Sequence, residues 1–391
     1  MKNPEKIASS AREYLLTHKE ELILFLKELV CHESPSDKIN SQHQILAYLK
    51  NRFLAMGYFV IHVSGKNTGG YLYARPKNRN KHLPFQLLIG HCDTVWPLGT
   101  IEEMPLIYDS GKIKGPGIYD MKAGITQIVF SLMALRELNI SPKVEPVVFI
   151  NSDEETGSRE TTNALKRLAK LADRAYVLEP PLGLNGKLKT ARKGLGRFTI
   201  TIRGKAAHAG LDPTKGVNAI VELSQQVQKL YAMNDLENGI TVNVGMIEGG
   251  ISPNMVAPSS KAVIDVRVLR EADGDVITKK IKELQPIHKD VEMEIEGGIG
   301  RPPMEKTPRN QHLWKLAKKQ GQELGLDLEE ATAGGGSDAN TTSLYTATLD
   351  GLGTPGDGAH ATHEYILQNK IVERTALLTL LLLLEPLTKR T

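Results

Sequence analysis

Residues 144–158 read VEPVVFINSDEETGS, a largely apolar run that leads directly into three consecutive acidic side chains. Such a run is typical of a strand that is covered on both faces of a sheet. At the end of a buried strand, Asp153, Glu154 and Glu155 would repel one another unless a cation lay among them. The alternative is a charged loop that caps the following helix.

Around this strand the chain alternates between helical and strand patterns, which is typical of an α/β layer structure. The pattern predicts strands over 59–63, 71–75 and 85–89, and helices over 5–30, 41–56 and 122–138. After Pro302-Pro303 the alternation returns, with a helix over 311–324 and a buried final helix over 376–384 that Pro386 stops.

The middle of the chain has a different order of elements. Its patterns predict strands over 196–203, 241–248, 262–269 and 291–295, and helices over 217–231 and 272–284. This β-α-β-β-α-β order is the split unit of a ferredoxin-like layer. Because 391 residues are more than one hydrophobic core usually serves, we expect two domains. One is formed by residues 1–192 and 304–391, and the other, residues 193–303, is inserted into it.

The composition excludes several classes of protein. The net charge is only +4, and no dense Lys/Arg run contains interleaved aromatic residues, so we expect no nucleic-acid partner. The longest apolar run, 376–384, is far shorter than the ~20 residues that span a bilayer, so we expect no membrane partner. The chain starts without the apolar core of a secretory signal. Its two cysteines, Cys31 and Cys92, form no CxxC pair, and together these features indicate a cytoplasmic protein.

Two further stretches place acidic and histidine side chains near the ends of predicted strands. In GHCDTV (90–95), His91 and Asp93 lie on the same side of an extended chain, where the carboxylate can orient a metal-bound imidazole. A core histidine satisfied by its neighbour is the alternative. In GPGIYDMKAG (115–124), Asp120 precedes a predicted helix, and a plain helix cap is the alternative.

Two more acidic or histidine motifs complete the set. Glu179 follows the apolar run that ends at Leu178, and the stretch 358–364 reads GAHATHE. Ligands of open α/β sheets bind outside the carboxyl ends of the strands, and several such clusters together are much less probable by chance than one. Imidazole and carboxylate ligands in combination suit zinc.

Taken in their order along the chain, the five motifs resemble the zinc-peptidase (M20-type) family that includes carboxypeptidase G2, the aminoacylases, succinyl-diaminopimelate desuccinylase and peptidase T. The resemblance spans nearly the whole chain and is greatest to the glutamate carboxypeptidase branch. It implies an α/β fold in which a mixed-sheet zinc-peptidase catalytic domain (1–192 and 304–391) carries an inserted ferredoxin-like α+β dimerisation domain (193–303). The expected assembly is therefore a homodimer.

The resemblance also implies two Zn²⁺ ions per chain, with Co²⁺ or Mn²⁺ as possible substitutes. Asp120 bridges both ions, His91 and Glu179 complete one site, and Glu155 and His360 complete the other. We choose His360 over His363 because Glu364 follows it at the spacing of the family. Asp93 is implied to orient His91, Glu154 to act as the general base, and the Asp120–Met121 peptide bond to be cis.

Residues that read the substrate are implied in the same way. His208 would stabilise the oxyanion in the active site of the partner subunit, and Arg301 would grip the α-carboxylate through paired donors. Asn254 matches another substrate contact, Lys187 a contact to a side-chain carboxylate, and Gly335 lies in a glycine-rich substrate loop. A solvated basic loop at Lys187 and a simple turn at Gly335 are the alternatives. For Arg267 we expect a structural ion pair with Asp265.

The function that these features predict is a zinc-dependent metallocarboxypeptidase. It would hydrolyse an amide bond next to a free carboxylate and release a carboxy-terminal glutamate or a similar residue from a small peptide or N-acyl amino acid. The alternatives are an N-acyl amino-acid amidohydrolase or dipeptidase with the same metal centre, and a non-catalytic carboxylate-binding protein on the same fold. The presence of Glu154 beside all five ligands argues against the last of these.

Overall fold

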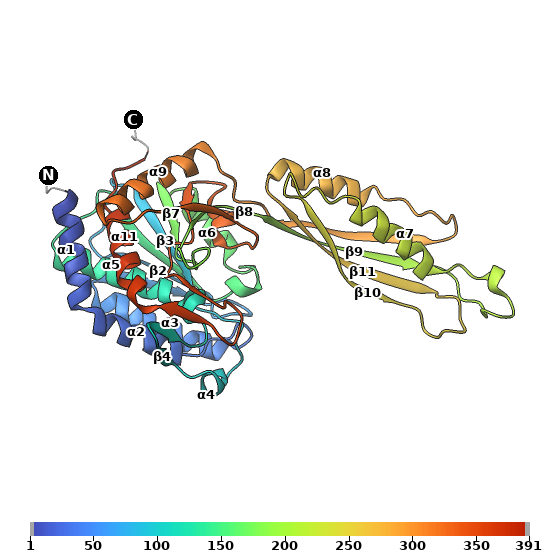
Figure 1. Cartoon of the computed structure of the whole chain (residues 1–391), viewed down its shortest axis with the longest axis horizontal. Coiled ribbons are helices and arrows are strands. Elements are labelled where there is room, and N and C mark those ends of the chain that lie inside the picture. The colour runs from blue at the N-terminus through green and yellow to red at the C-terminus, as the bar shows by residue number, and fades with distance from the viewer. Residues whose placement is uncertain (1–3, 388–391) are drawn as a thin grey trace. The chain divides into compact units, whose positions relative to one another are not determined.

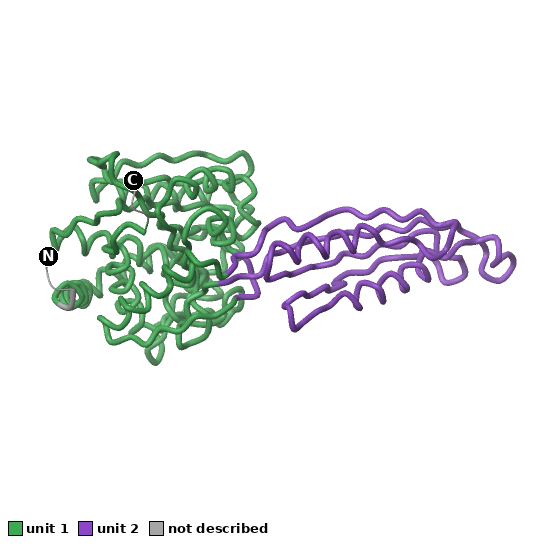
Figure 2. Tube along the Cα trace, turned by 90° about the horizontal axis from the view of Figure 1, so that it is seen from above, with its two compact units in different colours: residues 1–190, 306–332, 337–391 green, residues 191–305, 333–336 purple. Residues whose placement is uncertain are grey.

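The computed structural model describes residues 4–387 and divides the chain into two compact units (Figure 2). Unit 1 comprises residues 1–190, 306–332 and 337–391, and unit 2 comprises residues 191–305 and 333–336. The sequence predicted an insertion over 193–303, and unit 2 of the structure has its main segment over 191–305. The segment 333–336 also belongs to unit 2, because backbone and arginine hydrogen bonds tie it to Lys193, Arg192 and Arg267.

Unit 1 is built on a six-stranded mixed sheet with the strand order β1-β2-β6-β3-β7-β14 (Figure 1). The four strands from β6 to β14 pair in parallel. Strand β2 pairs antiparallel with β6, and β1 pairs antiparallel with β2. The strand bounds are β1 Tyr58–Val63, β2 Tyr71–Pro76, β3 Phe85–His91, β6 Glu145–Asn151, β7 Arg174–Val177 and β14 Ala347–Leu349. The central strands β3 and β7 are buried along their full length, as expected for parallel strands covered on both faces.

Helices cover this sheet, and two of them differ from the prediction. Instead of one helix over 5–30, the chain forms α1 (Pro4–Thr17) and α2 (Lys19–Cys31), because it leaves helical geometry at His18, whose Nδ1 binds the carbonyl oxygen of Tyr14 at 2.8 Å. The final helix α11 (Gln368–Leu381) begins earlier than its apolar run and ends before Pro386. The other helices are α3 Ile39–Ala55, α4 Thr100–Glu103, α5 Ala123–Glu137, α6 Thr162–Ala169, α9 Pro308–Glu323 and α10 Asp338–Thr342.

Short strands that the apolar pattern did not predict form two further sheets. One has the order β15-β16-β5-β4 and the other pairs β13 with β8. Their bounds are β4 Ile107–Asp109, β5 Lys112–Lys114, β8 Leu188–Arg192, β13 Glu330–Ala333, β15 Gly356–Asp357 and β16 Tyr365–Leu367. Most of these strands have only two to four residues, too few to show a period in the sequence.

Unit 2 has the predicted ferredoxin-like arrangement. Its antiparallel sheet has the order β10-β11-β9-β12, and the strands are β9 Gly194–Arg203, β10 Thr241–Gly249, β11 Ser259–Val268 and β12 Glu292–Arg301. The helices α7 (Ala219–Tyr231) and α8 (Glu271–Lys282) pack on this sheet. Alternate residues of β11 (Ala262, Ile264, Val266 and Val268) are buried in a core of their own, as a half-buried strand requires.

Helix α5 lies in the middle of unit 1 and every side chain from Ala123 to Leu135 is buried. Its amino end touches the end of strand β7 so closely that a Cβ atom on Gly124 would lie 2.1 Å from the carbonyl oxygen of Leu178. Glycine is therefore required there for packing. Since Glu179 directly follows Leu178, this contact also fixes the place of a predicted metal ligand.

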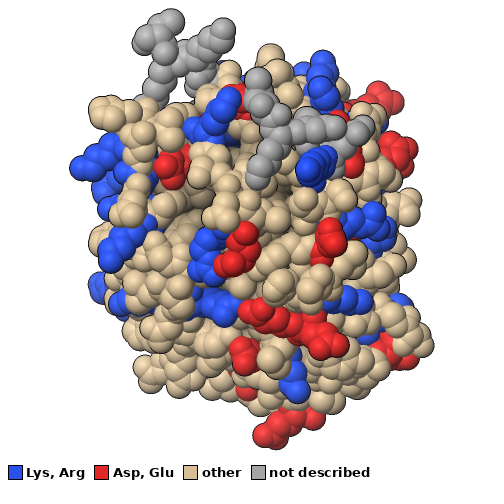
Figure 3. All heavy atoms as spheres, turned by 90° about the vertical axis from the view of Figure 1, so that its left-hand side faces the viewer, with Lys and Arg blue, Asp and Glu red and all other residues tan. Residues whose placement is uncertain are grey.

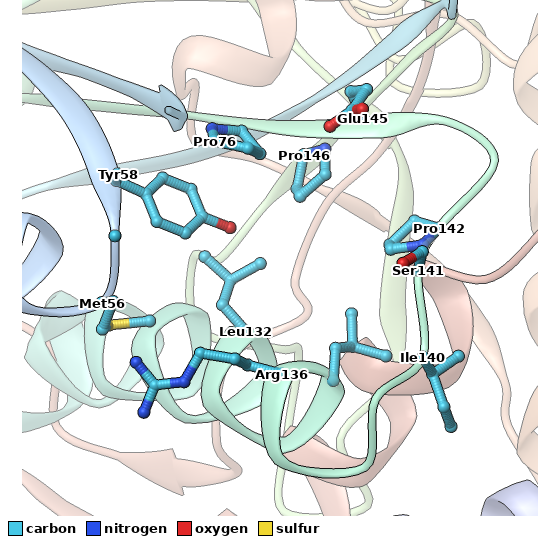
Figure 4. Close-up of a pocket in the computed structure, with 12 residues that line it drawn as sticks. Met56, Tyr58, Pro76, Leu132, Arg136, Ile140, Ser141, Pro142, Glu145 and Pro146 are labelled. Carbon is cyan, nitrogen blue, oxygen red and sulfur yellow. The ribbon is translucent and has the colours of Figure 1, made fainter. Parts of the chain in front are cut away.

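A cavity of about 280 Å³ lies at the other end of α5 (Figure 4). Tyr58, Leu132 and Ile140 line it together with Arg136 and Glu145, and the tyrosine hydroxyl points into it. Glu145 begins strand β6, whereas the acidic motifs of the sequence follow the carboxyl ends of strands. None of the predicted site residues lines this cavity.

The surface shows no concentration of one charge on the face drawn in Figure 3, where basic and acidic side chains are interspersed. Among residues 4–387, no helix is both long and apolar enough to cross a bilayer.

We predict that Gly124→Ala lowers the free energy of unfolding by about 1–3 kcal/mol, the usual cost of overpacking a core. The added methyl group must push α5 away from Leu178, so the variant should also bind divalent metal more weakly. Thermal denaturation and metal titration measure both effects. Gly298→Ala is the matched control, because a Cβ atom there meets nothing within 4 Å. Equal stability of the two variants would show that the close contact is absent.

Candidate metal centre

The five predicted metal ligands come together at the carboxyl ends of the strands of unit 1. His91 ends β3, Glu155 lies in the turn after β6, and Glu179 follows β7 by two residues. Asp120 lies in the turn Ile118–Lys122 before α5, and His360 lies between β15 and β16. Parallel strands bring residues that are distant in sequence to this edge.

These side chains form two groups that share one carboxylate. His91, Asp120 and Glu179 form the first group, and Asp120, Glu155 and His360 the second, with the ligand atoms of each group within 4.8 Å of one another. The shared residue offers one oxygen to each group: Asp120 Oδ1 lies 3.3 Å from His91 Nε2, and its Oδ2 lies 3.6 Å from His360 Nε2.

The remaining distances complete each group. Glu179 Oε1 lies 3.5 Å from His91 Nε2, and Glu155 Oε2 lies 3.1 Å from His360 Nε2. The first group is largely buried, whereas His360 in the second is exposed. A small molecule can therefore reach the centre from the side of His360.

The pKa values of the two histidines show that the centre attracts positive charge. Burial alone would lower the pKa of His91, but hydrogen bonds to Asp120, Asp93 and Glu179 outweigh it and hold the pKa well above its usual value. The hydrogen bond to Glu155 raises the pKa of His360 to about 9. Burial, followed by the charge of Asp120, raises the pKa of Glu155, although its hydrogen bond with His360 opposes this.

The donor set fits a pair of divalent metal ions. Each group offers one imidazole nitrogen and carboxylate oxygens, which zinc and similar metals accept. His91 Nδ1 lies 3.0 Å from the carbonyl oxygen of Asp93, to which it donates, so Nε2 faces the carboxylates. A proton on Nε2 satisfies those carboxylates, and a metal cation in the same position would replace that proton.

Asp93 links the first group to the loop after β6. Its carboxylate accepts hydrogen bonds from the backbone N–H groups of Glu154 at 3.2 Å and Glu155 at 3.1 Å, and from Ser36 Oγ at 2.9 Å. Asp93 Oδ1 also lies 3.4 Å from His91 Nδ1. One buried carboxylate therefore contacts both a histidine ligand and the segment that carries the predicted base.

Glu364 is a buried carboxylate whose structural role was not predicted from the sequence. It accepts hydrogen bonds from the N–H groups of Gly117, Tyr119 and Asp120 at 2.8, 2.8 and 3.1 Å, and from Trp96 Nε1 at 2.8 Å. Burial raises the pKa of Glu364, although these hydrogen bonds oppose the shift. Its spacing from His360 was the only sign of it in the sequence. The turn that it holds contains the Asp120–Met121 peptide bond, which is cis as predicted.

Four of the predicted substrate contacts lie in unit 2, and among them His208 and Asn254 are neighbours. The backbone N–H of Ala209 donates to the carbonyl oxygen of Asn254 at 3.0 Å. The imidazole of His208 accepts hydrogen bonds at Nδ1 from the N–H groups of Gly210 and Leu211, both at 3.1 Å. Its proton therefore resides on Nε2, which is free to act as a donor.

The glycine-rich loop, residues 334–336, is held by two arginines. Arg267 Nη1 donates to the carbonyl oxygen of Gly334 at 2.9 Å, and Arg192 Nη1 donates to those of Gly335 and Gly336 at 3.1 and 2.9 Å. The expected pair between Arg267 and Asp265 is present at 2.9 Å. Arg301 lies in the same unit at the end of β12.

Lys187, in unit 1, has a partner that the sequence analysis did not foresee. Its Nζ lies 2.5 Å from Glu329 Oε2, and both side chains are partly exposed. The lysine therefore has an acidic partner in the structure, and a substrate carboxylate would have to take the place of Glu329.

The chain is similar to known proteins in both sequence and fold. Residues 190–287 match a family described as a peptidase dimerisation domain. The chain is 32% identical to carboxypeptidase G2 of Pseudomonas sp. over 286 residues, which cover 72% of this chain and 69% of that one. The structure resembles that of the aminopeptidase PepT from Bacillus cereus, with 23% identity, a TM-score of 0.81, and coverage of 93% and 98%. It also resembles a dinuclear metal-binding peptidase of the M20 family from Bacillus subtilis, with 14% identity, a TM-score of 0.70, and coverage of 94% and 98%.

We predict that the protein binds about two divalent ions per chain and that Asp120→Ala loses both, because both groups depend on this carboxylate. The affinity of the second group should rise with pH up to about 9, since below the raised pKa of His360 the ion bound there must displace a proton. Elemental analysis of dialysed protein and titrations at several pH values measure this. Metal binding that is retained in Asp120→Ala, or that does not depend on pH, would contradict the shared centre.

Proposed function

The chain belongs to the M20 family of metallopeptidases, and on that premise we propose that it is a two-zinc carboxypeptidase. It hydrolyses an amide bond next to a free carboxylate and releases a carboxy-terminal glutamate or a similar amino acid. The observation that carries this proposal is the pair of ligand groups joined by Asp120, with Glu154 directly before the ligand Glu155. A centre of this kind is suited to hydrolysis of a carbonyl compound by water.

His91, Asp120 and Glu179 would hold one zinc ion, and Asp120, Glu155 and His360 the other. Bound there, the ions supply polarisation of the scissile carbonyl and a lower pKa for water. Glu154 would act as the general base, taking a proton from the attacking water and passing it to the leaving amine. The backbone N–H of Glu154 donates to the Asp93 carboxylate, and this hydrogen bond restrains the backbone of the base beside His91.

His208 is proposed as the donor to the oxyanion of the tetrahedral intermediate. Two backbone N–H groups occupy its Nδ1, which leaves an N–H at Nε2 for the substrate. Because residues 190–287 match a dimerisation domain, we propose a homodimer in which His208 serves the active site of the partner subunit.

Arg301 would bind the α-carboxylate of the substrate, and Asn254 would be a further substrate contact. Gly335 would contact the substrate through its backbone, and Lys187 would bind the side-chain carboxylate of glutamate. The pair between Lys187 and Glu329 favours a second candidate. If Glu329 stays in place, no free positive charge remains at Lys187, and an N-acyl amino acid or dipeptide with a neutral side chain becomes the preferred substrate. Both candidates use the same centre and the same base.

The proposal places the enzyme in the cytoplasm. Neither cysteine is in a disulfide, and Cys92 is buried as a thiol, as in proteins of reducing compartments.

We predict that Glu154→Gln lowers kcat by at least about a hundredfold and keeps both metals, since the amide retains the shape but cannot take a proton. Assays on zinc-loaded protein with acyl-glutamate, acyl-leucine and dipeptide panels measure this, with elemental analysis beside them. Glu102→Gln, an exposed change in α4, is the control. If the wild type cleaves none of these substrates, or if Glu154→Gln remains active, the proposed function is wrong.

We predict that two inactive variants, Glu154→Gln and His208→Ala, restore activity when they are unfolded and refolded together. In a mixed dimer, one site combines an intact Glu154 with an intact His208 from the other chain. Random mixing makes about half of the dimers mixed, so about a quarter of the wild-type activity should return. A mixture that stays inactive, or a monomer at assay concentration, would contradict a histidine acting across the dimer.

A further inference from the structure

The segment that carries Glu154 and Glu155, residues 152–157, is held by buried carboxylates on more than one side. Asp93 accepts hydrogen bonds from the backbone of Glu154 and Glu155. We propose that Asp338, which follows the glycine-rich loop and is not among the metal ligands, is a positioning residue for the reaction. This inference rests on the proposed function. Asp338 fixes the two ends of residues 152–157, here called the base loop, and so sets the position of the Glu154 carboxylate.

The carboxylate of Asp338 joins the residues that flank the base loop. Its Oδ2 accepts a hydrogen bond from Asn151 Nδ2 at 2.8 Å, and its Oδ1 accepts one from Ser158 Oγ at 2.6 Å. Asn151 is the last residue of β6 and Ser158 is the first residue after the loop. A carboxylate is suited to this task because both of its oxygens accept, whereas an amide offers one acceptor.

Inside the loop, short-range hydrogen bonds leave little freedom once the ends are fixed. The backbone N–H of Ser158 donates to the carbonyl oxygen of Asp153 at 2.7 Å, and that of Gly157 to the carbonyl oxygen of Glu154, also at 2.7 Å. The Asp153 carboxylate in turn accepts from the N–H of Thr161 at 3.2 Å. A shift of Asn151 or Ser158 would therefore move the loop as a body.

The loop end at Asn151 also touches the strand of the first metal group. The carbonyl oxygen of Asn151 accepts the N–H of Cys92 at 2.8 Å, one residue beyond His91. Asp338 thus binds, through Asn151, the junction between the base loop and β3.

Asp338 is itself firmly held. It is the first residue of α10, is 2% exposed, and follows Ser337, whose Oγ donates to Asp350 Oδ2 at 2.9 Å. The N–H of Ser337 donates to Asn340 Oδ1 at 2.9 Å, which closes a capping box. A buried carboxylate costs free energy unless it is well bonded, so its use here points to a need for position beyond mere packing.

The effect on chemistry follows from what else restrains the loop. A bound metal would restrain Glu155, whereas Glu154 is not a predicted ligand and its carboxylate moves with the loop that carries it. A displacement of about 1 Å can cost about a hundredfold in rate. Loss of the Asp338 contacts should therefore lower kcat with little change in metal content or KM.

The test compares Asp338→Asn and Ser158→Ala, each of which removes one acceptor or donor of this link, with the control Asp173→Asn. Asp173 has a side chain that is 0% exposed and accepts the N–H of Leu387 at 3.1 Å, away from the base loop. For both test variants we expect kcat to fall about ten- to a hundredfold with KM within about twofold. Metal content should stay at the wild-type value, and amide exchange of residues 152–158 should become faster. The control should keep the wild-type kcat and loop exchange, whatever its stability.

Unchanged exchange of residues 152–158 in both Asp338→Asn and Ser158→Ala would overturn the inference, as would an unchanged kcat. If Asp338→Asn does not fold, Ser158→Ala alone carries the test. If the wild type cleaves no substrate of the panel, the proposed function fails, and the exchange measurement still decides whether Asp338 holds the loop.

Discussion

The structure of unit 1 depends on the need to bring one carboxylate, that of Asp120, between two histidines and two further acidic side chains. So many negative charges at partly buried positions are tolerable only if positive charge lies among them. The pKa values of His91 and His360 are raised because the neighbouring carboxylates favour the protonated, positively charged imidazoles. In the family to which the chain belongs, metal ions supply this positive charge. The nitrogen and oxygen donors of the site are suited to replacing the protons with metal ions.

Much of the surrounding polar structure holds these ligands in place. Glu364 binds three backbone N–H groups of the turn that ends in Asp120, and Asp93 binds the backbone of Glu154 and Glu155. Asp338 binds the residues on either side of that same loop. Three carboxylates outside the predicted ligand set thus restrain the segments that carry predicted ligands and the predicted base, as outer contacts orient ligands in metal sites generally. Gly124 adds a steric restraint, since only glycine lets α5 approach Leu178.

The sequence was sufficient to predict the mixed sheet, the ferredoxin-like insertion and the cis peptide bond at Asp120, because long apolar runs and a family motif carry this information. It was insufficient for the break at His18, where a single side chain interrupts a continuous apolar period. It also missed β4, β5, β15 and β16, which are too short to show a pattern. Glu364 and Asp338 escaped for another reason: their roles come from hydrogen bonds to residues as far as 247 and 187 positions away, which no local spacing encodes.

We propose that two metal ions share the carboxylate of Asp120. X-ray absorption of the fully loaded protein at the zinc edge tests this most directly, since it reports the ligand atoms and the distance between the metals. We expect a shell of nitrogen and oxygen atoms only, with a metal–metal distance of about 3.5–4 Å. A sulfur ligand, or the absence of any metal–metal scattering at full loading, would contradict it.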